Sequence, residues 1–301
     1  MNKSNKKLII DKISHIIFLI IGVICSLSIV VIISFIILKG SRPFIIKYAN
    51  GQKATLIKFL FSTKYNYNNY GALGIVINTI FIVFVVSIIA LPLSVLTSLF
   101  IVRIAPKKIG HILQMVVELL SSIPSIIFGL FGMGIINPMV KNLAKIFNYQ
   151  TAGGVSTLSV ILVLVMMIMP TITTLSITSM KAIKNTQINA SLALGATMMQ
   201  TNYNIVIKGA KSGIFSALIL GIGRALGEAT AISMVCGGNN GISIGLFNPT
   251  STITSTMLEG IHESVGLDYD IRFSLGILLI LLILFSNIIL NIIKKRMCRY
   301  E

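Results

Sequence analysis

The chain has 301 residues, of which 55% are hydrophobic and only 11% are charged, and its mean hydropathy is +0.93. A soluble domain carries about a quarter charged residues, so this composition excludes a soluble globular protein. The formal net charge of +17 could indicate a nucleic-acid partner, but the positions of the basic residues along the chain indicate a membrane topology instead.

Six apolar runs are long enough to cross a bilayer, which takes about 20 helical residues. We therefore predict an all-α, polytopic membrane protein with six transmembrane helices, near 15–38, 72–102, 112–136, 155–180, 212–236 and 271–293. The predicted organisation is an N-terminal part at 1–71 (cytoplasmic tail, first helix and outer loop), a five-helix core at 72–293, and a basic tail at 294–301.

The basic residues predict how the chain is oriented. Fifteen of the 25 lysines and arginines fall in the segments that are cytoplasmic if the N-terminus is inside, and eight fall in the outer segments between helices. This bias follows the positive-inside rule. It predicts a multi-pass protein of the cell membrane with both termini in the cytoplasm and no nucleic-acid partner. The first outer loop, about 39–71, is an exception with six basic residues.

The first helix lacks an A-x-A cleavage site and is longer than the apolar part of a signal peptide, so it predicts a retained signal anchor. The next three helices each contain a proline, at Pro92, Pro124 and Pro170. A proline removes one helical hydrogen bond and kinks the helix. Kinks of this kind are typical of transporters, but plain packing geometry explains them equally well.

The third helix reads ELLSSIPSIIFGLFGMG, and Gly129 and Gly132 on it would allow neighbouring backbones to approach closely. The segment that follows the fourth helix, about 181–211, is too long and too patterned for a simple turn. Its stretch ASLALGATMMQTNYNIVI is amphipathic and predicts one or two short helices at the membrane surface, separated at Gly195. A cytoplasmic partner would find this surface exposed.

The fifth helix, GIFSALILGIGRALGEATAISMV, carries two opposite charges, Arg224 and Glu228, four residues apart. That spacing predicts one helical face for both side chains. A charge placed mid-bilayer costs at least about 2.5 kcal/mol, so this face should line a polar path or the protein interior. A guanidinium presents a planar donor fork suited to oxyanions. The alternative is a buried structural ion pair that joins the fifth helix to its neighbours. Gly223 and Gly227 form a GxxxG pattern beside them.

The outer loop at 237–270 carries four acidic residues, Glu259, Glu263, Asp268 and Asp270. They indicate either a docking rim for a partner or an ordinary solvated surface. The segment TSTITSTMLEGIHES within the loop could re-enter as a short helix.

Catalytic and metal-binding signatures are missing from the sequence. It has no GxxxxGK[ST] stretch for ATP, no HExxH and no CxxC, and its three cysteines lack metal-ligand spacing. We therefore predict a protein that is not an enzyme, with no catalytic residue, metal or cofactor of its own.

One segment resembles the EAA loop of ABC-importer permeases, which reads E-A-A, three residues, G, nine residues, I-x-L-P. Here Asn189-Ala190-Ser191, three residues, Gly195 and nine residues precede Ile205. Asn189 stands where that family has Glu, and Lys208 stands where it has Pro. Over about 70–293 the segments ELLSSIPSIIFGLFG, STLSVILVLVMMIMPTITTLS, GIGRALGEATAI and NPTSTITSTMLEGIHES resemble phosphate-specific permeases of the PstC type.

The resemblance implies a type I ABC-importer permease fold and a permease subunit of an ATP-driven importer of inorganic phosphate. Such a subunit forms half of the translocation pathway. It works with a second homologous permease, two copies of a cytoplasmic ATP-binding subunit that hydrolyses the ATP, and an extracytoplasmic phosphate-binding protein. The loop residues Asn189, Ala190, Ser191, Gly195 and Ile205 would then couple to the ATPase.

In that setting Arg224 would bind phosphate in the pathway, and Glu228 would hold Arg224 in place and keep phosphate from binding too tightly. Three alternatives remain open. The first is an ABC permease for another oxyanion, such as phosphonate, sulfate or molybdate. The second is a secondary carrier driven by an ion gradient, and the third is a membrane scaffold.

Overall fold

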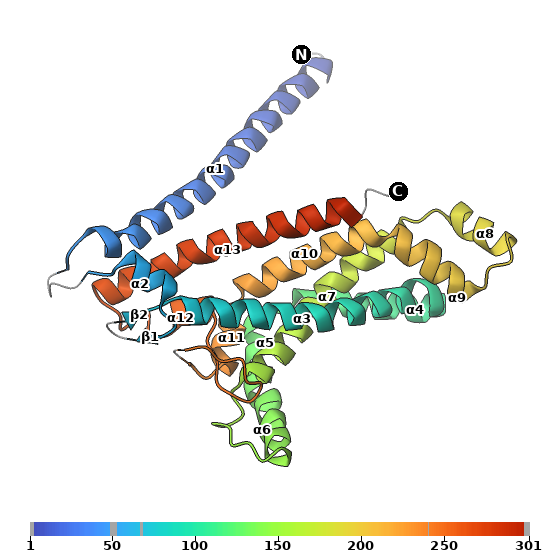
Figure 1. Ribbon diagram of the computed structural model, residues 1–301. Helices are drawn as coiled ribbons and strands as arrows, with labels where there is room; N and C mark the ends of the chain where they lie inside the picture. The colour runs from blue at the N-terminus through green and yellow to red at the C-terminus, as the bar shows by residue number, and fades with distance from the viewer. Residues whose placement is uncertain (1–2, 49–52, 67–68, 240, 298–301) are drawn as a thin grey trace.

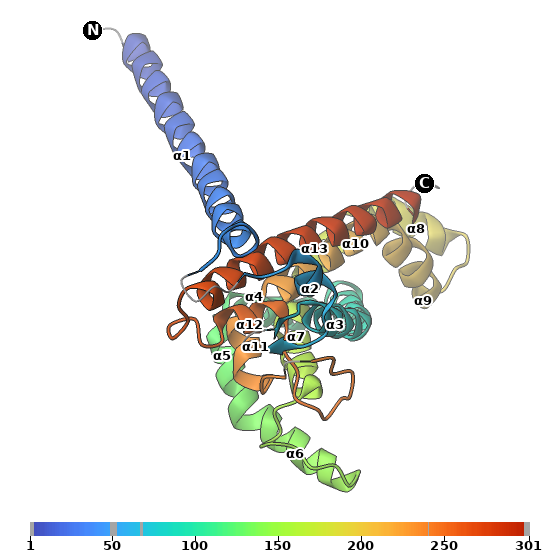
Figure 2. The same cartoon turned by 60° about the vertical axis from the view of Figure 1, so that its left-hand side comes forward.

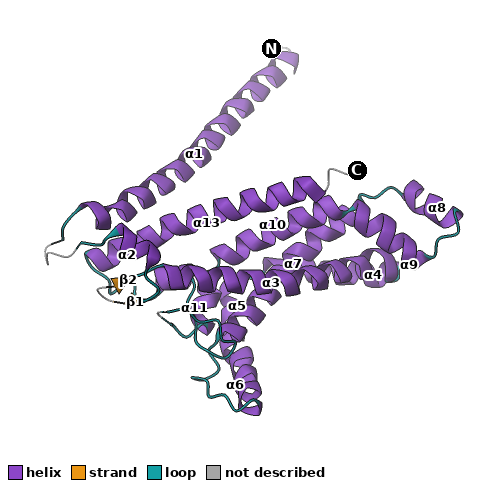
Figure 3. Cartoon of the chain, in the orientation of Figure 1, coloured by secondary structure: helices purple, strands orange, loops and turns teal. Residues whose placement is uncertain are grey.

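The protein is described here by a computed structural model covering residues 3–48, 53–66, 69–239 and 241–297, with side chains from residue 11 onward. Part of the predicted basic tail, residues 298–301, lies outside the described residues. The described chain consists of helices joined by loops, with one antiparallel pair of two-residue strands, β1 (Tyr65–Asn66) and β2 (Asn69–Tyr70) (Figure 3).

Within the described residues, five helices are long and apolar enough to cross a bilayer. A sixth span results if the segments Met198–Ile207 and Lys211–Gly227, bent by 63° at a short break, are counted as one. The prediction of a polytopic all-helical protein is therefore confirmed. The five are α1 (Lys3–Ile45), α3 (Leu73–Leu99) with the π-helix η1 (Phe100–Ile104), α5 (Ser125–Phe131) with η2 (Gly132–Ile136) and α6 (Asn137–Ile146), α7 (Thr157–Lys181), and α13 (Leu267–Met297).

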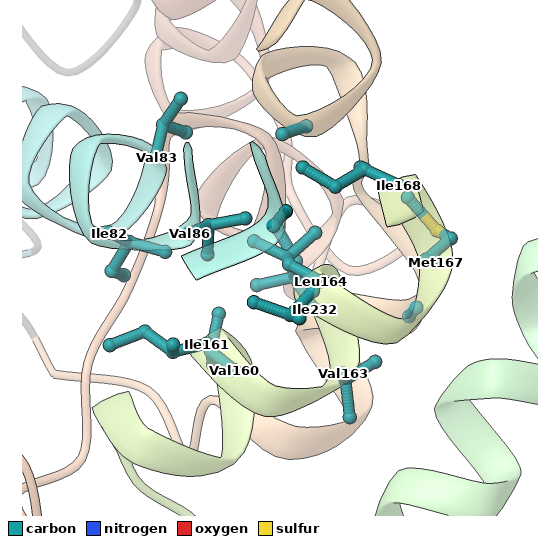
Figure 4. Packing of buried hydrophobic residues seen from close by; sticks show 14 of the residues in the cluster. Ile82, Val83, Val86, Val160, Ile161, Val163, Leu164, Met167, Ile168 and Ile232 are labelled. Carbon is teal, nitrogen blue, oxygen red and sulfur yellow. The ribbon is translucent and has the colours of Figure 1, made fainter. Parts of the chain in front are cut away.

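Helix α7 is the centre of the bundle. Two thirds of its most apolar stretch is buried inside the chain. Leu164 and Ile168 of α7 are fully buried and pack against Val86 of α3 and Ile232 further along the chain (Figure 4). A helix that is apolar on all sides is expected at such a central position.

Helix α1 lies apart from the rest of the bundle over most of its length (Figures 1 and 2). None of its most apolar stretch is buried. Its C-terminal part contacts α13, where a Cβ on Gly40 would lie 2.7 Å from the backbone of Phe273. The Ser274 hydroxyl donates to the Gly40 carbonyl at 2.7 Å, and the rings of Phe35 and Phe273 meet edge to face.

The third predicted span, 112–136, is broken rather than kinked. Helix α4 (Lys107–Ser122) ends before Pro124, and α5 starts at Ser125. Ile123 and Pro124 both have extended backbones, because a proline disfavours helical geometry in the residue before it and has no N–H to donate. After the break the chain continues through α5 and η2 into α6, which projects away from the bundle (Figures 1 and 2). By contrast, α3 and α7 continue through Pro92 and Pro170.

The fifth predicted span, 212–236, is also divided, so the prediction of one continuous helix there is wrong. Helix α10 (Lys211–Gly227) ends at Gly227, Glu228 is extended with φ −73° and ψ 126°, and a short helix, α11 (Thr230–Val235), follows. Helix α11, which follows the break at Glu228, packs on α5, which follows the break at Pro124.

At one end of the bundle lie α2 (Leu56–Phe61), the strand pair and a short helix, α12 (Ile253–Leu258) (Figure 1). Helix α12 is buried against α13 and α11, so a short helix does form within the segment TSTITSTMLEGIHES, and its re-entry into the membrane stays a prediction. At the opposite end lie α8 (Asn185–Ala193), α9 (Met198–Thr201) and the π-helix η3 (Asn202–Ile207), near the C-terminus (Figure 1).

Candidate functional site

Arg224 lies in the last turn of α10 and is half-buried. Its Nη1 donates a hydrogen bond of 2.7 Å to Oγ1 of Thr171, in the middle of α7. A positive charge is favoured at this position because the C-terminal end of a helix carries a partial negative charge. Among the described residues the guanidinium has no other hydrogen-bond or ion-pair partner. Most of its donors therefore remain available to a ligand.

Glu228 occupies the break between α10 and α11. Its Oε1 accepts a hydrogen bond of 3.0 Å from the Ala231 N–H, which caps the start of α11. Its backbone carbonyl accepts from the Thr254 hydroxyl of α12 at 2.5 Å. The Thr254 hydroxyl takes up the Glu228 carbonyl, and the Glu228 carboxylate caps the next helix. Together these two bonds explain why α10 ends before this residue.

The structure therefore keeps Arg224 and Glu228 close in sequence but gives them separate partners. Both are described residues, and they form no ion pair with each other. The prediction that they share one helical face is wrong because α10 ends at Gly227. Among the described residues neither charge forms an ion pair with a neighbouring helix, and the contacts that join this region to α7 and α12 are hydrogen bonds.

The glycines of the two broken helices behave differently. A Cβ on Gly129 would lie 3.0 Å from the Cα of Ala231, and one on Gly132 would lie 2.6 Å from Val235. These two glycines therefore let α5 pack closely on α11, as expected from the sequence. A Cβ on Gly223 or Gly227 would meet nothing within 4 Å, so the GxxxG face of α10 is open beside Arg224.

The outer loop is held over this region by polar residues of α3 that the sequence analysis missed. Asn78 donates to the Gly241 carbonyl at 2.9 Å and accepts from the Ser243 N–H at 2.8 Å. Thr79 accepts from the Ile253 N–H, the first residue of α12, at 3.0 Å. The signal in the sequence was an adjacent Asn–Thr pair inside the apolar run IVINTIFIVFVV.

Arg272, near the start of α13, is a second buried arginine, only 8% exposed. It donates to the Thr256 carbonyl at 2.8 Å, to the Glu259 carbonyl, and to the Ser264 hydroxyl at 3.0 Å. It also lies 3.5 Å from the Asp268 carboxylate. Arg272 thus fixes the end of α12 and the loop that follows it, a role that its position in the sequence did not indicate.

The four acidic residues of the outer loop divide into two pairs. Asp268 faces Arg272, and the buried Asp270 accepts a hydrogen bond of 2.6 Å from Tyr48 and lies 3.5 Å from Lys39. Both are used inside the chain. Glu259 and Glu263 are exposed. Of the predicted docking rim, these two side chains are free to meet a partner.

The loop that resembles the EAA motif forms a compact helical unit at one end of the bundle (Figure 1). Asn189 and Ala190 are exposed on α8, and Ser191 forms a 3.0 Å hydrogen bond with Thr201 of α9. Gly195 has φ +84°, a left-handed conformation that favours glycine and reverses the chain between the two helices. Ile205 is half-buried in η3.

Four large side chains around this turn are exposed, and we call them the tip patch: Leu194, Met198, Met199 and Tyr203. Leu194 is 89% exposed. A group of apolar side chains exposed together at the end of a helical unit is typical of a protein-binding surface. The sequence analysis named other residues of this loop but not these four.

The same unit is joined firmly to the bundle. Ile188 of α8 and Val206 of η3 are buried with Leu99 of α3 and Met180 of α7. Arg103 of η1 donates from Nε to Oδ1 of Asn202 at 3.1 Å. A displacement of the tip patch would therefore be passed directly to the ends of α3 and α7.

The sequence pattern of one protein family, described as "Binding-protein-dependent transport system inner membrane component", matches residues 91–299. Among curated relatives, a phosphate transport system permease protein PstC from Pasteurella multocida is 27% identical over 250 residues, covering 77% of this chain and 76% of that protein. A probable PstC from Methanocaldococcus jannaschii is 29% identical over 233 residues, covering 73% and 74%. A probable ABC transporter permease, YqgH of Bacillus subtilis, is 28% identical over 274 residues, covering 89% and 85%.

Two solved structures are similar in fold. A chain of a bacterial alginate ABC transporter, in complex with an alginate-bound periplasmic protein, aligns with a TM-score of 0.61 at 15% identity over 91% of this chain and 94% of that one. A chain of the MetNI methionine ABC transporter in an inward-facing conformation aligns with a TM-score of 0.55 at 17% identity, covering 73% and 93%. The helices described above thus have the arrangement of an ABC-importer permease.

Proposed function

The chain belongs to the family of inner membrane components of binding-protein-dependent transport systems, and on that premise we propose that it is the permease subunit of an ATP-driven importer of inorganic phosphate. It is a multi-pass inner-membrane protein and a transport subunit rather than an enzyme. ATP hydrolysis belongs to a separate chain.

Arg224 is the observation that carries an oxyanion as the substrate. Its half-buried guanidinium is held by one hydrogen bond from Nη1 to Thr171 and lies beside the open glycine face of α10. A guanidinium stays charged at any accessible pH and binds tetrahedral oxyanions through two parallel N–H donors. The relatives named as phosphate permeases favour phosphate among the oxyanions.

Glu228 serves this site in a way different from the one expected. Its carboxylate is engaged with the N–H of Ala231 and its carbonyl with Thr254, so it fixes the break that ends α10 just after Arg224. In this proposal the break sets the height of Arg224 in the pathway. The nearby negative charge also weakens phosphate binding enough for the ion to leave.

The partners proposed are those of a binding-protein-dependent ABC importer. A second, homologous permease would complete the pathway across the open Gly223 and Gly227 face. Two copies of an ATP-binding subunit would receive the loop of Asn189, Ala190, Ser191, Gly195 and Ile205 together with the tip patch. An extracytoplasmic phosphate-binding protein would dock on the outer loops, where Glu259 and Glu263 are exposed.

The proposed orientation places both termini and the tip patch in the cytoplasm, as the distribution of basic residues favours. Residues 72–293 then form the permease core and residues 1–71 a peripheral helix with its outer loop. When the ATP-binding subunits close, the tip patch moves with them. The buried contacts of Ile188 with Leu99 and Met180 carry that motion to α3 and α7, and through Thr171 of α7 to Arg224.

The test is uptake of labelled phosphate by phosphate-starved cells with and without this chain, with sulfate, molybdate and a phosphonate as competitors. We expect high-affinity uptake to depend on the chain and to resist all three competitors. Arg224→Ala should abolish this uptake, and Arg224→Lys should retain only a small part of it because an ammonium lacks the planar fork. Full uptake by Arg224→Ala would contradict the pathway role.

A permease for another oxyanion is the second candidate, because a guanidinium fork fits sulfate, molybdate and phosphonate as well as phosphate. The same experiment separates the two. Under this alternative, phosphate uptake is unchanged by loss of the chain, and uptake of one competitor falls instead.

A further inference from the structure

A basic pocket lies at the coupling-loop end of the bundle, away from Arg224. Its volume is about 250 Å³, and its walls come from η1, the start of α4 and the end of α7. Two of its side chains are basic, Lys107 and Lys181, and His111 adds an imidazole. Gln114 adds an amide. One water occupies about 30 Å³ in the liquid, so the pocket has room for a tetrahedral oxyanion with several waters.

Close contacts between helices build the walls of the pocket. A Cβ on Gly110 would lie 2.7 Å from the Ile101 carbonyl, so α4 lies directly against η1. On the other wall, Lys181 Nζ donates to Gln114 Oε1 at 2.6 Å, and Gln114 donates in turn to Glu118 at 2.8 Å. These bonds hold the ammonium of α7 and the amide of α4 at one mouth.

Polar side chains of α7 connect this pocket with the Arg224 site. Thr171, Thr174, Thr178 and Lys181 follow at intervals of three or four residues, so they share one face of the helix. Thr171 and Thr174 are half-buried, whereas Thr178 and Lys181 are exposed. The face thus opens steadily toward the pocket. Ten helical residues separate its ends, about 15 Å along the axis.

Helix α4 presents a matching polar face. Lys107, His111, Gln114 and Glu118 are spaced at i, i+4, i+7 and i+11 and share one side, while exposed apolar residues such as Ile112, Val116 and Leu119 occupy the other. A polar face at membrane depth does not face lipid. The apolar side of α4 is therefore the one suited to lipid, and the polar side faces the same space as the α7 threonines.

We propose that this pocket is a second binding position for a phosphate group, at the cytoplasmic end of the polar face that begins at Arg224. The inference rests on the proposed function, because it makes the pocket the position that imported phosphate reaches before release. Lys107 and Lys181 supply the charge, and the His111 ring and the remaining N–H of the Gln114 amide supply further hydrogen bonds. The headgroup of an anionic lipid has the same chemistry and is the other source of a phosphate group at this end of the bundle.

The experiment measures binding of labelled inorganic phosphate to the purified full-length chain carrying Arg224→Ala, in nanodiscs of phosphatidylcholine. Removing Arg224 eliminates the first site, so the remaining binding reports the pocket. Lys181→Gln, or the pair Lys107→Gln and His111→Gln, should weaken it at least tenfold. Lys108→Gln is the matched control, since Lys108 carries the same charge on the same helix but does not line the pocket.

A second arm identifies the lipid source. The same variants are placed in nanodiscs that contain phosphatidylglycerol, and lipid retained after detergent extraction is counted by native mass spectrometry. Retention lost in Lys181→Gln and kept in Lys108→Gln, without binding of free phosphate, assigns the phosphate-group site to a lipid headgroup. Absence of both kinds of binding, or an equal effect of Lys108→Gln, overturns the proposal.

The outcome is independent of the transport test. If phosphate uptake by cells does not depend on the chain but the pocket binds phosphate, the proposed function fails and the phosphate site stands without a role in transport. If uptake does depend on the chain but the pocket binds nothing, the site fails and the proposed function stands. The two pocket variants act from different helices, so loss of binding in both is not explained by misfolding of one. Thermal unfolding of each variant checks this directly.

Discussion

At the residue scale, Arg224 has one hydrogen-bond partner among the described residues, and that partner is neutral. A threonine hydroxyl that accepts from a guanidinium positions the charge without neutralising it. A carboxylate in the same place would compete with an incoming anion. An anion site needs a fixed geometry and a positive charge that no carboxylate neutralises. The Arg224–Thr171 pair provides both.

Thr171→Val tests this pair. Valine keeps the shape of threonine but cannot accept the hydrogen bond. We expect KM for phosphate to rise about tenfold with kcat less affected, because a hydrogen bond to a charged group contributes about 1.5–3 kcal/mol and about 1.4 kcal/mol is a factor of ten. Initial rates of uptake at varied phosphate concentration measure it.

Ser179→Ala is the control for that variant. Ser179 is a half-buried hydroxyl on the same helix, and its own hydrogen bond goes to the Leu175 carbonyl within α7. An unchanged KM in Thr171→Val, or an equal rise in Ser179→Ala, would show that the hydroxyl of Thr171 does not position Arg224.

The sequence identified Arg224 because an arginine in an apolar run stands out from composition alone. It gave no sign of Thr171, since small hydroxyl residues are common in membrane helices and most bond to their own backbone, as Thr173 and Thr174 do here. Which threonine faces an arginine depends on how α7 and α10 pack, and no local pattern encodes that.

At the element scale, the two broken helices differ in how far the local sequence predicts the break. The break at Pro124 is a local effect, and the sequence predicted a disturbance at the right residue. The break at Glu228 has no proline. It follows from Thr254, 26 residues further along, which donates to the Glu228 carbonyl. The apolar run alone therefore predicts one continuous helix from 212 to 236, because the residue that causes the break lies outside it.

The loop helices were predicted better because their signal is local. Gly195 at a left-handed turn and the amphipathic pattern on either side of it are properties of a few neighbouring residues. The exposed tip patch was not predicted, because an exposed Leu194 and a buried Ile188 look alike in a hydrophobicity count.

The tip patch yields a prediction about assembly. Leu194→Glu should prevent the ATP-binding subunit from co-purifying with this chain, because an ionised carboxylate would have to be buried in an apolar contact. The monomer should fold as before, since Leu194 is almost fully exposed. Pull-down from membranes followed by quantification of the ATP-binding subunit measures the effect.

Leu281 is also exposed, but it lies within the span α13. Leu281→Glu would place a charge in the bilayer and is therefore not a suitable comparison. Gln187→Glu on exposed α8 adds the same charge next to the patch and serves as the control. Normal co-purification of the Leu194 variant would show that the partner docks elsewhere.

The packing of α5 on α11 yields a prediction about stability. In Gly129→Val the new side chain would overlap Met234 and the backbone of Ala231, so overpacking of about 1–3 kcal/mol is expected. The melting temperature of the purified chain should fall. Adding Met234→Ala to Gly129→Val should restore only part of the lost melting temperature, because the Ala231 backbone cannot move aside.

Gly134→Val is the matched control on the next turn, where a Cβ would meet nothing within 4 Å. An equal loss of stability in both variants would mean that helix propensity, and not the α5–α11 contact, is responsible.

At the scale of the whole molecule, the first and last helices are joined by a small polar cluster. Asp270 of α13 accepts from Tyr48 and faces Lys39 of α1, and Lys39 also lies over the ring of Tyr269. The rest of α1 diverges from the bundle (Figure 2). This cluster and the neighbouring Gly40 contact therefore determine where α1 meets the rest of the protein.

The cluster has a defined response to pH. Burial, followed by the hydrogen bond to Asp270 and its negative charge, raises the pKa of the Tyr48 phenol above its usual range. A raised pKa means that the bond contributes fully below the unfolded value near pH 10 and is lost only as pH rises through the higher folded value. We expect Tyr48→Phe to cost about 1 kcal/mol, with the same loss of melting temperature at about pH 6 and about pH 9.

Asp270→Asn is the companion variant. It removes the charge that faces Lys39 but leaves an oxygen that can accept from Tyr48. The loss of stability in this variant should therefore become smaller as salt is added. A cost of Tyr48→Phe that disappears at the higher pH would show that the phenol is already ionised there and that the bond is not the one described.

The contact between Gly40 and Ser274 also sets the order in which the protein can be completed. The two residues are separated by more than 230 positions, and at about 5–20 residues per second the ribosome needs roughly 10–50 s to make the intervening chain. Through that interval α1 lacks its contacts with α13, although its C-terminal end meets α2 through the ring contact of Phe44 with Phe59. The mean hydropathy of 3.3 over its most apolar 18 residues lets the helix stay in the bilayer without α13. A chain arrested before α13 should therefore keep α1 inserted but leave it free to pair with other membrane helices, which makes late synthesis the vulnerable stage for quality control.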